Sequence, residues 1–212
     1  IIGLSTLLLA SCSTYDKVLK SNDHSLKLST ANQYYEEERW FRANELYAAL
    51  LPVMKATKNY EEIMYRYAYS YFNMKDYLTA SYQFKTFLEL FPKSTRAEEM
   101  RFMYAKSLYL DSPKTSLDPT NTREAMAAMA NYIKQNPDGN YITEAATLLD
   151  ELSEKLLTKD QKAAKLYFDM GQYRAAKIAY TELIDKYPTS KANDYNQLMI
   201  VKANYLFANK SK

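Results

Sequence analysis

The residue types that carry out catalysis or bind metals are scarce in this sequence of 212 residues. It contains one histidine, His24, and one cysteine, Cys12. No glycine-rich phosphate loop, nucleophile elbow or His/Cys set with metal-ligand spacing occurs in it. The carboxylate runs Glu36–Glu38 and Glu98–Glu99 occupy consecutive positions, which point in different directions around a helix and are typical of solvated faces. We therefore expect a protein that is not an enzyme and that uses neither a cofactor nor a metal.

Cys12 follows an apolar segment, Ile1–Ala10, and its thiol is suited to acylation. Ten residues make about 15 Å of helix and cannot cross a hydrocarbon core of about 30 Å, so the segment is typical of a secretory signal peptide. The initiator Met and the basic leader are missing, so residues 1–11 are interpreted as a signal peptide that is incomplete at its N-terminus. The small residues Ala10 and Ser11 resemble a bacterial lipoprotein box, in which the cysteine sulfur takes a diacylglyceryl group before cleavage. We predict lipidation at Cys12; the alternative is an ordinary secreted protein with a chance cysteine near its cleavage site.

Residues 12–25 are then the lipidated cysteine and a short polar tether. Several acyl chains, at ~0.8 kcal/mol per buried CH₂, suffice for stable anchoring in a membrane. Ser13 rather than Asp after the cysteine resembles lipoproteins that are sent on to the outer membrane, and only one acid, Asp16, lies close behind. We therefore expect an outer-membrane lipid anchor on a protein that faces the periplasm.

One spacing recurs four times in the body of the chain: an Ala, an apolar or aromatic residue four positions on, another at seven, and a Pro near twelve. The copies are Ala43, Tyr47 and Leu50 with an early Pro52; Ala80, Phe84, Phe87 and Pro92; Ala125, Met129, Tyr132 and Pro137; and Ala176, Tyr180, Leu183 and Pro188. Positions i, i+4 and i+7 share one face of a helix, which the Pro ends. A further Ala precedes each copy, which completes the paired-helix signature of roughly 34 residues known as the tetratricopeptide repeat. The sequence therefore predicts an all-α fold, a tetratricopeptide-repeat solenoid of about five helix-turn-helix repeats.

The composition agrees with a helical scaffold. Of the residues, 47% are hydrophobic and 25% are charged. Only three are Gly, and Ala, Leu, Lys, Glu and Met are abundant, which favours helix throughout. The 21 tyrosines suit half-buried positions, where the ring packs and the hydroxyl reaches water. The net charge is only +3 and no long basic cluster occurs, so nucleic acid is not an expected partner.

The repeat spacing also gives the expected organisation of the chain. Helices are predicted at about 26–38, 40–54, 60–73, 76–90, 95–110, 120–135, 142–157, 158–170, 173–187 and 191–208. A loop at 112–120, rich in Pro, Ser and Thr, interrupts the third helix pair. Asp111 and Asp118 flank this loop and could bind a cation, although loop polarity explains them equally well. The predicted domains are repeats 1–3 at residues 26–138 and, at 139–212, an extra helix with repeats 4–5, of which the last is incomplete.

In this order, behind a lipidated cysteine, these features resemble the BamD-type outer-membrane assembly lipoproteins of the β-barrel assembly machinery. The resemblance covers nearly all of residues 12–208. The segments that carry it are Phe91–Ser94, the insertion Ser112–Ala125, Gly171–Ala176 and Asp185–Ser190. The departures from the family are a degenerate first repeat and an unfinished last one.

The resemblance implies a non-enzymatic scaffold of the complex that folds β-barrel proteins into the outer membrane. Its C-terminal repeats would dock the periplasmic domains of the central barrel subunit, and its N-terminal repeats would receive unfolded outer-membrane protein clients. First helices of a solenoid line one face, and the aromatic residues there that are suited to grip an extended client, or else to fill the core, are Tyr35, Tyr65, Tyr69, Phe72, Phe102 and Tyr109. The polar residues expected to be exposed on the last helix and to dock the partner are Lys191, Asn193, Asp194 and Asn196.

Two other functions remain open at the level of sequence. One is a glycan-binding outer-membrane lipoprotein of a nutrient-uptake system, which uses aromatic platforms but is usually longer and richer in Trp than this chain with its single Trp40. The other is a generic lipoprotein repeat adaptor for peptidoglycan or secretion machinery. Both would be binding proteins, so the three possibilities differ in the partner and not in the fold.

Overall fold

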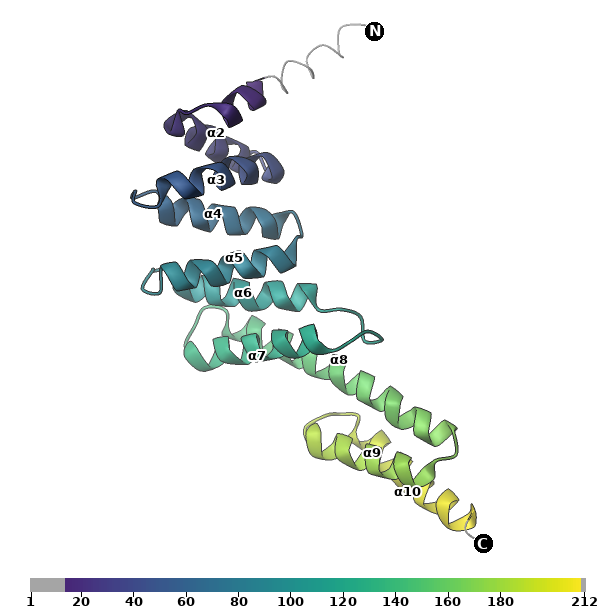
Figure 1. Ribbon diagram of the computed structural model, residues 1–212. Coiled ribbons are helices and arrows are strands. Elements are labelled where there is room, and N and C mark those ends of the chain that lie inside the picture. Colours follow the sequence, from purple (N-terminus) through teal and green to yellow (C-terminus); the bar gives the residue numbers. More distant parts are fainter. Residues whose placement is uncertain (1–13, 211–212) are drawn as a thin grey trace, which may run out of the picture. The chain divides into compact units, whose positions relative to one another are not determined.

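The computed structural model describes residues 14–210, and helices are the only regular elements in that range (Figure 1). The helices that follow residue 23 are α2 (His24–Glu36), α3 (Trp40–Met54), α4 (Tyr60–Asn73), α5 (Tyr77–Leu90), α6 (Ala97–Asp111), α7 (Thr120–Gln135), α8 (Ile142–Asp169), α9 (Tyr173–Lys186) and α10 (Asn193–Lys210). This confirms the all-α prediction. None of the described helices has the length and apolar character needed to cross a bilayer.

The chain forms two compact units, each with its own packing. Unit 1 runs up to Asp111 and unit 2 begins at Ser112. Within each unit every helix packs against the next one in sequence, from α2 to α6 in unit 1 and from α7 to α10 in unit 2. The break between the units therefore falls at the predicted loop, inside the third helix pair. The repeat-based boundary at residue 138 does not coincide with it and stays a prediction.

The small residues of the repeat spacing lie where helices come close together. Every Ala of that spacing is fully buried, and with Ala of the preceding helices the set comprises Ala31, Ala43, Ala68, Ala80, Ala105, Ala125, Ala164 and Ala176. Large side chains from the same helix faces fill the space beside them, for example Tyr47 and Phe84 in unit 1 and Tyr132 and Tyr180 in unit 2, all at most 1% exposed. A side chain larger than Ala would push such helices apart, because interiors are packed to crystal-like density.

The turn inside three helix pairs has one geometry. Gly171 after α8 has a φ of 71°, and its N–H donates to the Phe168 carbonyl at 3.0 Å. Lys75 after α4 has a φ of 64° and makes the equivalent contact with Phe72 at 2.9 Å. Glu38 after α2, with a φ of 58°, forms the third example. Gly is the residue that adopts this left-handed conformation most easily, so only the turn at Gly171 was evident from the sequence.

Two segments differ from the expected pattern. Helix α8 is one continuous helix of 28 residues, whereas two helices, 142–157 and 158–170, were expected. Neither Gly nor Pro occurs within α8, so nothing in the sequence ends a helix near residue 157. Residues 14–20, expected in the polar tether, are helical, and Tyr15 and Val18 in this segment are only 8% exposed.

Candidate binding surface

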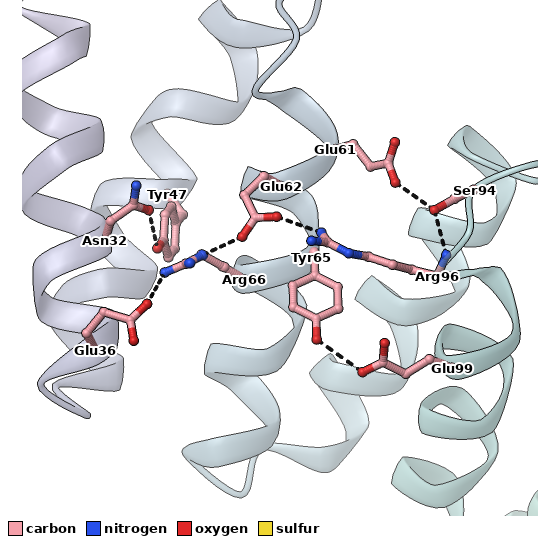
Figure 2. A network of polar contacts seen from close by, with 10 residues as sticks. All are labelled: Asn32, Glu36, Tyr47, Glu61, Glu62, Tyr65, Arg66, Ser94, Arg96 and Glu99. Carbon is pink, nitrogen blue, oxygen red and sulfur yellow. Dashed lines mark hydrogen bonds and ion pairs between the residues drawn. The ribbon is translucent and has the colours of Figure 1, made fainter. Parts of the chain in front are cut away.

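A chain of ion pairs in unit 1 connects α2, α4 and the start of α6, which are the first helices of three successive helix pairs. Arg66 on α4 donates from Nη1 to Glu36 Oε1 of α2 at 2.7 Å and from Nε to Glu62 Oε1 at 2.6 Å (Figure 2). Arg96, just before α6, donates from Nη1 to the other oxygen of Glu62 at 2.7 Å. We call Glu36, Arg66, Glu62 and Arg96 the charge ladder. Its members lie on or beside the first helix of each pair, so the ladder runs across the face that these helices form.

Aromatic rings flank the charge ladder. The guanidinium carbon of Arg66 lies 4.9 Å from the centroid of the Tyr35 ring, and that of Arg96 lies 4.2 Å from the Tyr65 ring. Such cation–π contacts contribute about 0.5–1 kcal/mol each at exposed sites. Both arginines are therefore held by a carboxylate and a ring together, which fixes the planes of the guanidinium groups.

Further carboxylates anchor the tyrosine hydroxyls and the start of α6. Glu99 Oε1 accepts hydrogen bonds from Tyr65, at 3.1 Å, and from Tyr69. Ser94 donates to Glu61 at 2.6 Å and accepts the Arg96 backbone N–H at 3.0 Å, which fixes the residue that carries the guanidinium. This network therefore contains four carboxylates and two guanidinium groups, so its residues carry an excess of negative charge.

The ionisation of this surface follows from its contacts. Burial alone would raise the pKa of Glu62, but hydrogen bonds from Arg66 and Arg96 outweigh that effect and lower it. Burial raises the pKa of Tyr35 to about 12. Burial and the neighbouring Glu99 carboxylate together raise the pKa of Tyr65 to about 12. At neutral pH the tyrosines therefore present neutral hydroxyls, while Glu62 stays ionised.

The aromatic residues predicted for client binding occupy three environments. Tyr35, Tyr65 and Tyr69 are half-buried beside the charge ladder, and we call these three residues, Glu99 and the charge ladder together the ladder surface. Phe72 is also half-buried, in a ring cluster with Tyr69, Tyr77 and Phe84 at centroid distances of 6.4, 5.4 and 6.3 Å.

The two predicted aromatic residues on α6 differ from each other. Phe102 is only 1% exposed, so the expectation that it lines a groove is wrong and it fills the core. Tyr109 is half-buried near the end of the helix. Phe102 and Tyr109 are seven residues apart, so both rings lie on the face of α6 that is directed toward neighbouring helices. Which of the two rings is buried depends on how those helices pack and not on the spacing.

The charged members of the surface were missed by the sequence analysis. Glu36 and Glu99 belong to two runs of consecutive glutamates that were interpreted as solvent-exposed. One signal was available, because Glu62 and Arg66 are four residues apart on one helix, a spacing that favours an ion pair. The pairing of Arg96 with Glu62 depends on the stacking of α6 against earlier helices and had no local signature.

The residues predicted to dock a partner at the start of α10 divide into two groups. Lys191 and Asp194 are exposed, as expected. Asn193 binds the preceding turn: its Nδ2 donates to the carbonyl of Tyr187 at 2.8 Å. Asn196 is fully buried and accepts a hydrogen bond from Gln161 of α8 at 2.9 Å, so the expectation that it is exposed is wrong.

Unit 2 exposes many large apolar side chains. Those at least 38% exposed are Leu117, Leu166, Tyr167, Met170, Ile178, Tyr195, Leu198, Val201, Tyr205 and Phe207. A cavity of about 630 Å³ opens between the α8–α9 turn and α10, and Tyr173, Ile178 and Phe207 are among its lining residues. Leu198, Val201 and Tyr205 follow an i, i+3, i+7 spacing, which places them on one face of α10.

No candidate metal centre is found in the part of the chain that the structure describes. No group of three or more His, Cys, Asp or Glu side chains there is arranged to hold a metal ion. Asp118 accepts the backbone N–H of Thr120 at 2.9 Å, at the start of α7, which agrees with the interpretation of loop polarity. Cys12, the predicted lipidation site, lies outside the described residues.

An all-helical chain of repeats with an aromatic and charged face in one unit and exposed apolar side chains in the other is typical of a scaffold that binds other proteins. The model of the YfiO family, described as outer membrane lipoprotein, matches residues 22–211, and the chain belongs to that family.

The relatives agree with this assignment. One is an outer membrane protein assembly factor BamD of Caulobacter vibrioides, 22% identical over 122 residues, which are 58% of this chain and 40% of the relative. Another is a putative outer membrane protein assembly factor BamD of Aquifex aeolicus, 27% identical over 128 residues, or 60% of this chain and 42% of the relative. The matched segments thus span about two fifths of the length of these relatives. The BamD-type resemblance seen in the sequence is confirmed.

Proposed function

We propose that this chain is a non-enzymatic scaffold lipoprotein of outer-membrane β-barrel assembly. The observation that carries the proposal is the family match over residues 22–211, together with the assembly-factor names of the relatives. In this function the protein carries out no chemistry. It holds an unfolded barrel protein and the central barrel subunit of the assembly complex in one complex through separate surfaces.

Unit 1 is the proposed client-binding unit. Its ladder surface offers rings in fixed positions, and each ring contact adds about 0.5–1.5 kcal/mol beyond the area it buries, without reading an exact sequence. The excess of negative charge disfavours acidic segments, since like charges across an interface are costly. The surface therefore suits extended, aromatic-rich client segments that are neutral or basic.

A crosslinking experiment tests this surface. Tyr65→Ala removes a half-buried ring of the ladder surface. Tyr82→Ala on α5 is the matched control, because Tyr82 is 66% exposed and lies outside that surface. We expect Tyr65→Ala to reduce crosslinking to unfolded barrel peptides several-fold and Tyr82→Ala to leave it unchanged. Equal crosslinking by both variants, with helicity intact, would remove unit 1 from the proposal.

Unit 2 is the proposed docking unit for the periplasmic domains of the central barrel subunit. Its exposed apolar side chains are of the kind that form the centre of protein interfaces, and Lys191 and Asp194 supply charges of the kind found at the rim. Asn193 and Asn196 act within the fold, by holding the start of α10 against the α9–α10 turn and α8. Their proposed contribution to docking is therefore indirect.

The proposed anchor is a lipid on Cys12, which holds a periplasm-facing protein at the outer membrane. Cys12→Ala should leave the protein with an uncleaved signal in the inner membrane or release it in soluble form. Fractionation of the variant with outer membranes, at the wild-type level, would contradict lipidation at this residue.

Copurification from mild detergent distinguishes the proposal from its two rivals. A barrel-assembly scaffold brings down a barrel protein with periplasmic domains, whereas a glycan-binding lipoprotein brings down a nutrient transporter. A generic adaptor brings down peptidoglycan or secretion components. The identity of the partner recovered with the wild-type protein decides among the three.

A further inference from the structure

The helical segment at residues 14–20 is docked on unit 1 and is not a free connection. Tyr15 donates its hydroxyl to Glu45 Oε2 on α3 at 2.6 Å. The Tyr15 ring packs edge-on against Tyr34 of α2 at 5.8 Å, and the guanidinium of Arg42 lies over the same ring at 5.3 Å. The segment is thus attached both to α2 and to α3.

Apolar packing adds to these polar contacts. Val18 is 8% exposed and belongs to the same core cluster as Tyr15, Ala31 and Leu46, and Leu19 packs against that cluster. A turn then leads directly into α2, where Asp23 accepts the Leu26 N–H at 2.9 Å and caps the helix. Because the segment is buried on one side and capped into α2, it is part of the first repeat.

The connection between this docked segment and the proposed lipidation site is very short. Only residues 13 and 14 separate Cys12 from Tyr15. Three residues of extended chain span at most about 11 Å. If the Cys12 sulfur carries acyl chains, its backbone lies in the interfacial region of the bilayer, and Tyr15 is within about 11 Å of that point.

We infer that the end of unit 1 formed by residues 14–20 and the start of α3 lies against the phospholipid surface of the membrane that holds the lipid on Cys12. This inference rests on the proposed lipidation. The occupant of this surface is the bilayer itself, because the chain between the anchor and the docked segment is too short to hold the first repeat away from it.

Phe41 is the side chain best placed to report this contact. It is 64% exposed on α3. It lies four residues before Glu45, the acceptor of the Tyr15 hydroxyl, so the two side chains share a face of the helix. An exposed aromatic ring beside the docked segment is well suited to the headgroup region, where aromatic side chains of membrane-associated proteins gather.

The test uses a fluorophore attached to a single introduced cysteine in the full-length lipoprotein, reconstituted in phospholipid vesicles with nitroxide-labelled headgroups. Phe41→Cys places the fluorophore beside the docked segment. Tyr82→Cys is the matched control, since Tyr82 is 66% exposed on α5, which packs against α4 and α6. Each variant is also made with ten Gly/Ser residues inserted between residues 13 and 14, a flexible spacer with an end-to-end distance of roughly 16–19 Å.

We expect the nitroxide to quench the label at position 41 at least three-fold more than the label at position 82. The Gly/Ser insertion should reduce quenching at position 41 to the level of the control. Equal quenching at both positions without the insertion overturns the inference, and so does quenching at position 41 that survives the insertion.

The wild-type protein separates this inference from the proposed function. With Cys12 acylated it has no free thiol and should take up no fluorophore while floating with the vesicles. Labelling of the wild type would show that Cys12 is not acylated. It would overturn both the proposed lipid anchor and the membrane contact inferred from it. Unlabelled, floating wild type combined with equal quenching at the two positions would overturn only the membrane contact.

Discussion

The two units use their cations differently. In unit 1, Arg66 and Arg96 join carboxylates from successive helix pairs through the charge ladder. In unit 2, Lys155 Nζ donates to the Ser112 carbonyl at 3.0 Å and Lys159 Nζ to the Leu117 carbonyl at 2.7 Å. Cations of unit 1 thus connect repeats, whereas these lysines of unit 2 hold a loop against a helix.

The surfaces differ accordingly. The ladder surface of unit 1 combines ion pairs with rings that are held in position. Both units also expose large apolar side chains, and in unit 2 some of these lie on α8, α9 and α10, beside the cavity that Ile178 and Phe207 line. The spacing of Ala and large residues in the cores is nevertheless the same in both units. The repeat fixes only the inside of the molecule, so each unit is free to carry a different kind of binding surface.

The largest effect is expected from overpacking a core Ala in one unit at a time. Ala80→Leu in unit 1 or Ala176→Leu in unit 2 should lower the free energy of unfolding by about 1–3 kcal/mol, because both residues are fully buried between helices. Trp40 is the only Trp and lies in unit 1, so its fluorescence reports that unit alone. Ala80→Leu should shift the Trp40 melting transition and Ala176→Leu should not.

Circular dichroism provides the control for this pair, because it reports both units. Each variant should show a lowered transition in the helical signal. If Ala176→Leu shifts the Trp40 transition as far as Ala80→Leu does, the units unfold together and the comparison between them does not extend to stability.

A smaller effect is expected when a ladder cation is neutralised. Arg66→Gln removes the bond between α2 and α4 and one of the two partners of Glu62, and its own side chain is only 21% exposed. Hydrogen bonds to charged groups contribute about 1.5–3 kcal/mol to stability. Because this site is partly exposed to solvent, we expect the free energy of unfolding to fall by about 1–2 kcal/mol. Chemical unfolding followed by Trp40 fluorescence measures it.

The matched variant in unit 2 is Lys165→Gln. Lys165 pairs with Asp169 at 2.6 Å on the surface of α8, with both side chains more than half exposed. Such pairs contribute about 0–1 kcal/mol, so the helical unfolding transition should hardly move. Equal losses for the two variants would show that the ladder is an ordinary set of surface ion pairs.

Alkaline pH should affect unit 1 through its tyrosines. The folded pKa of Tyr35 and of Tyr65 is about 12, above the unfolded value of about 10. A raised folded pKa contributes stability that is complete below pH 10 and is lost as the pH rises toward 12. Urea unfolding followed by Trp40 fluorescence should therefore have a lower midpoint at pH 11.5 than at pH 9. An unchanged midpoint would contradict the burial of these hydroxyls.

Features of this structure that depend on neighbouring residues in the sequence were predictable, whereas contacts between distant segments were not. The Ala spacing predicted the helix pairs and the buried core. The order of the repeats and the insertion at 112–125, behind the predicted lipidation site, predicted the family. Gly171 predicted its turn, but Lys75 adopts the same left-handed conformation without a sequence signal. Contacts that depend on stacking, such as Arg96 with Glu62, were not predictable because their partners are far apart in sequence.

Burial at a given helical position was the least predictable property. Phe102 and Asn196 were assigned to surfaces because of their residue type and helix, and both are buried. For Asn196 the reason is a specific acceptor–donor pair with Gln161, which provides the hydrogen bond that a buried amide requires. Tyr15 was assigned to a polar tether. It is buried because Glu45 of α3, far along the sequence, accepts a hydrogen bond from its hydroxyl.

The smallest effect is expected at the rim of the proposed docking surface of unit 2. Lys191→Glu/Asp194→Lys exchanges two exposed charges, and surface substitutions usually change stability by no more than about 0.5 kcal/mol. Rim charges act mainly on association rate and register, so copurification of the barrel subunit should weaken and become more sensitive to salt. The matched control in unit 1 is Lys85→Glu/Glu89→Lys on α5, where both residues are also exposed. If the two exchanges weaken partner recovery equally, docking is not confined to unit 2; if neither does, the apolar side chains of unit 2 dock the partner without help from these charges.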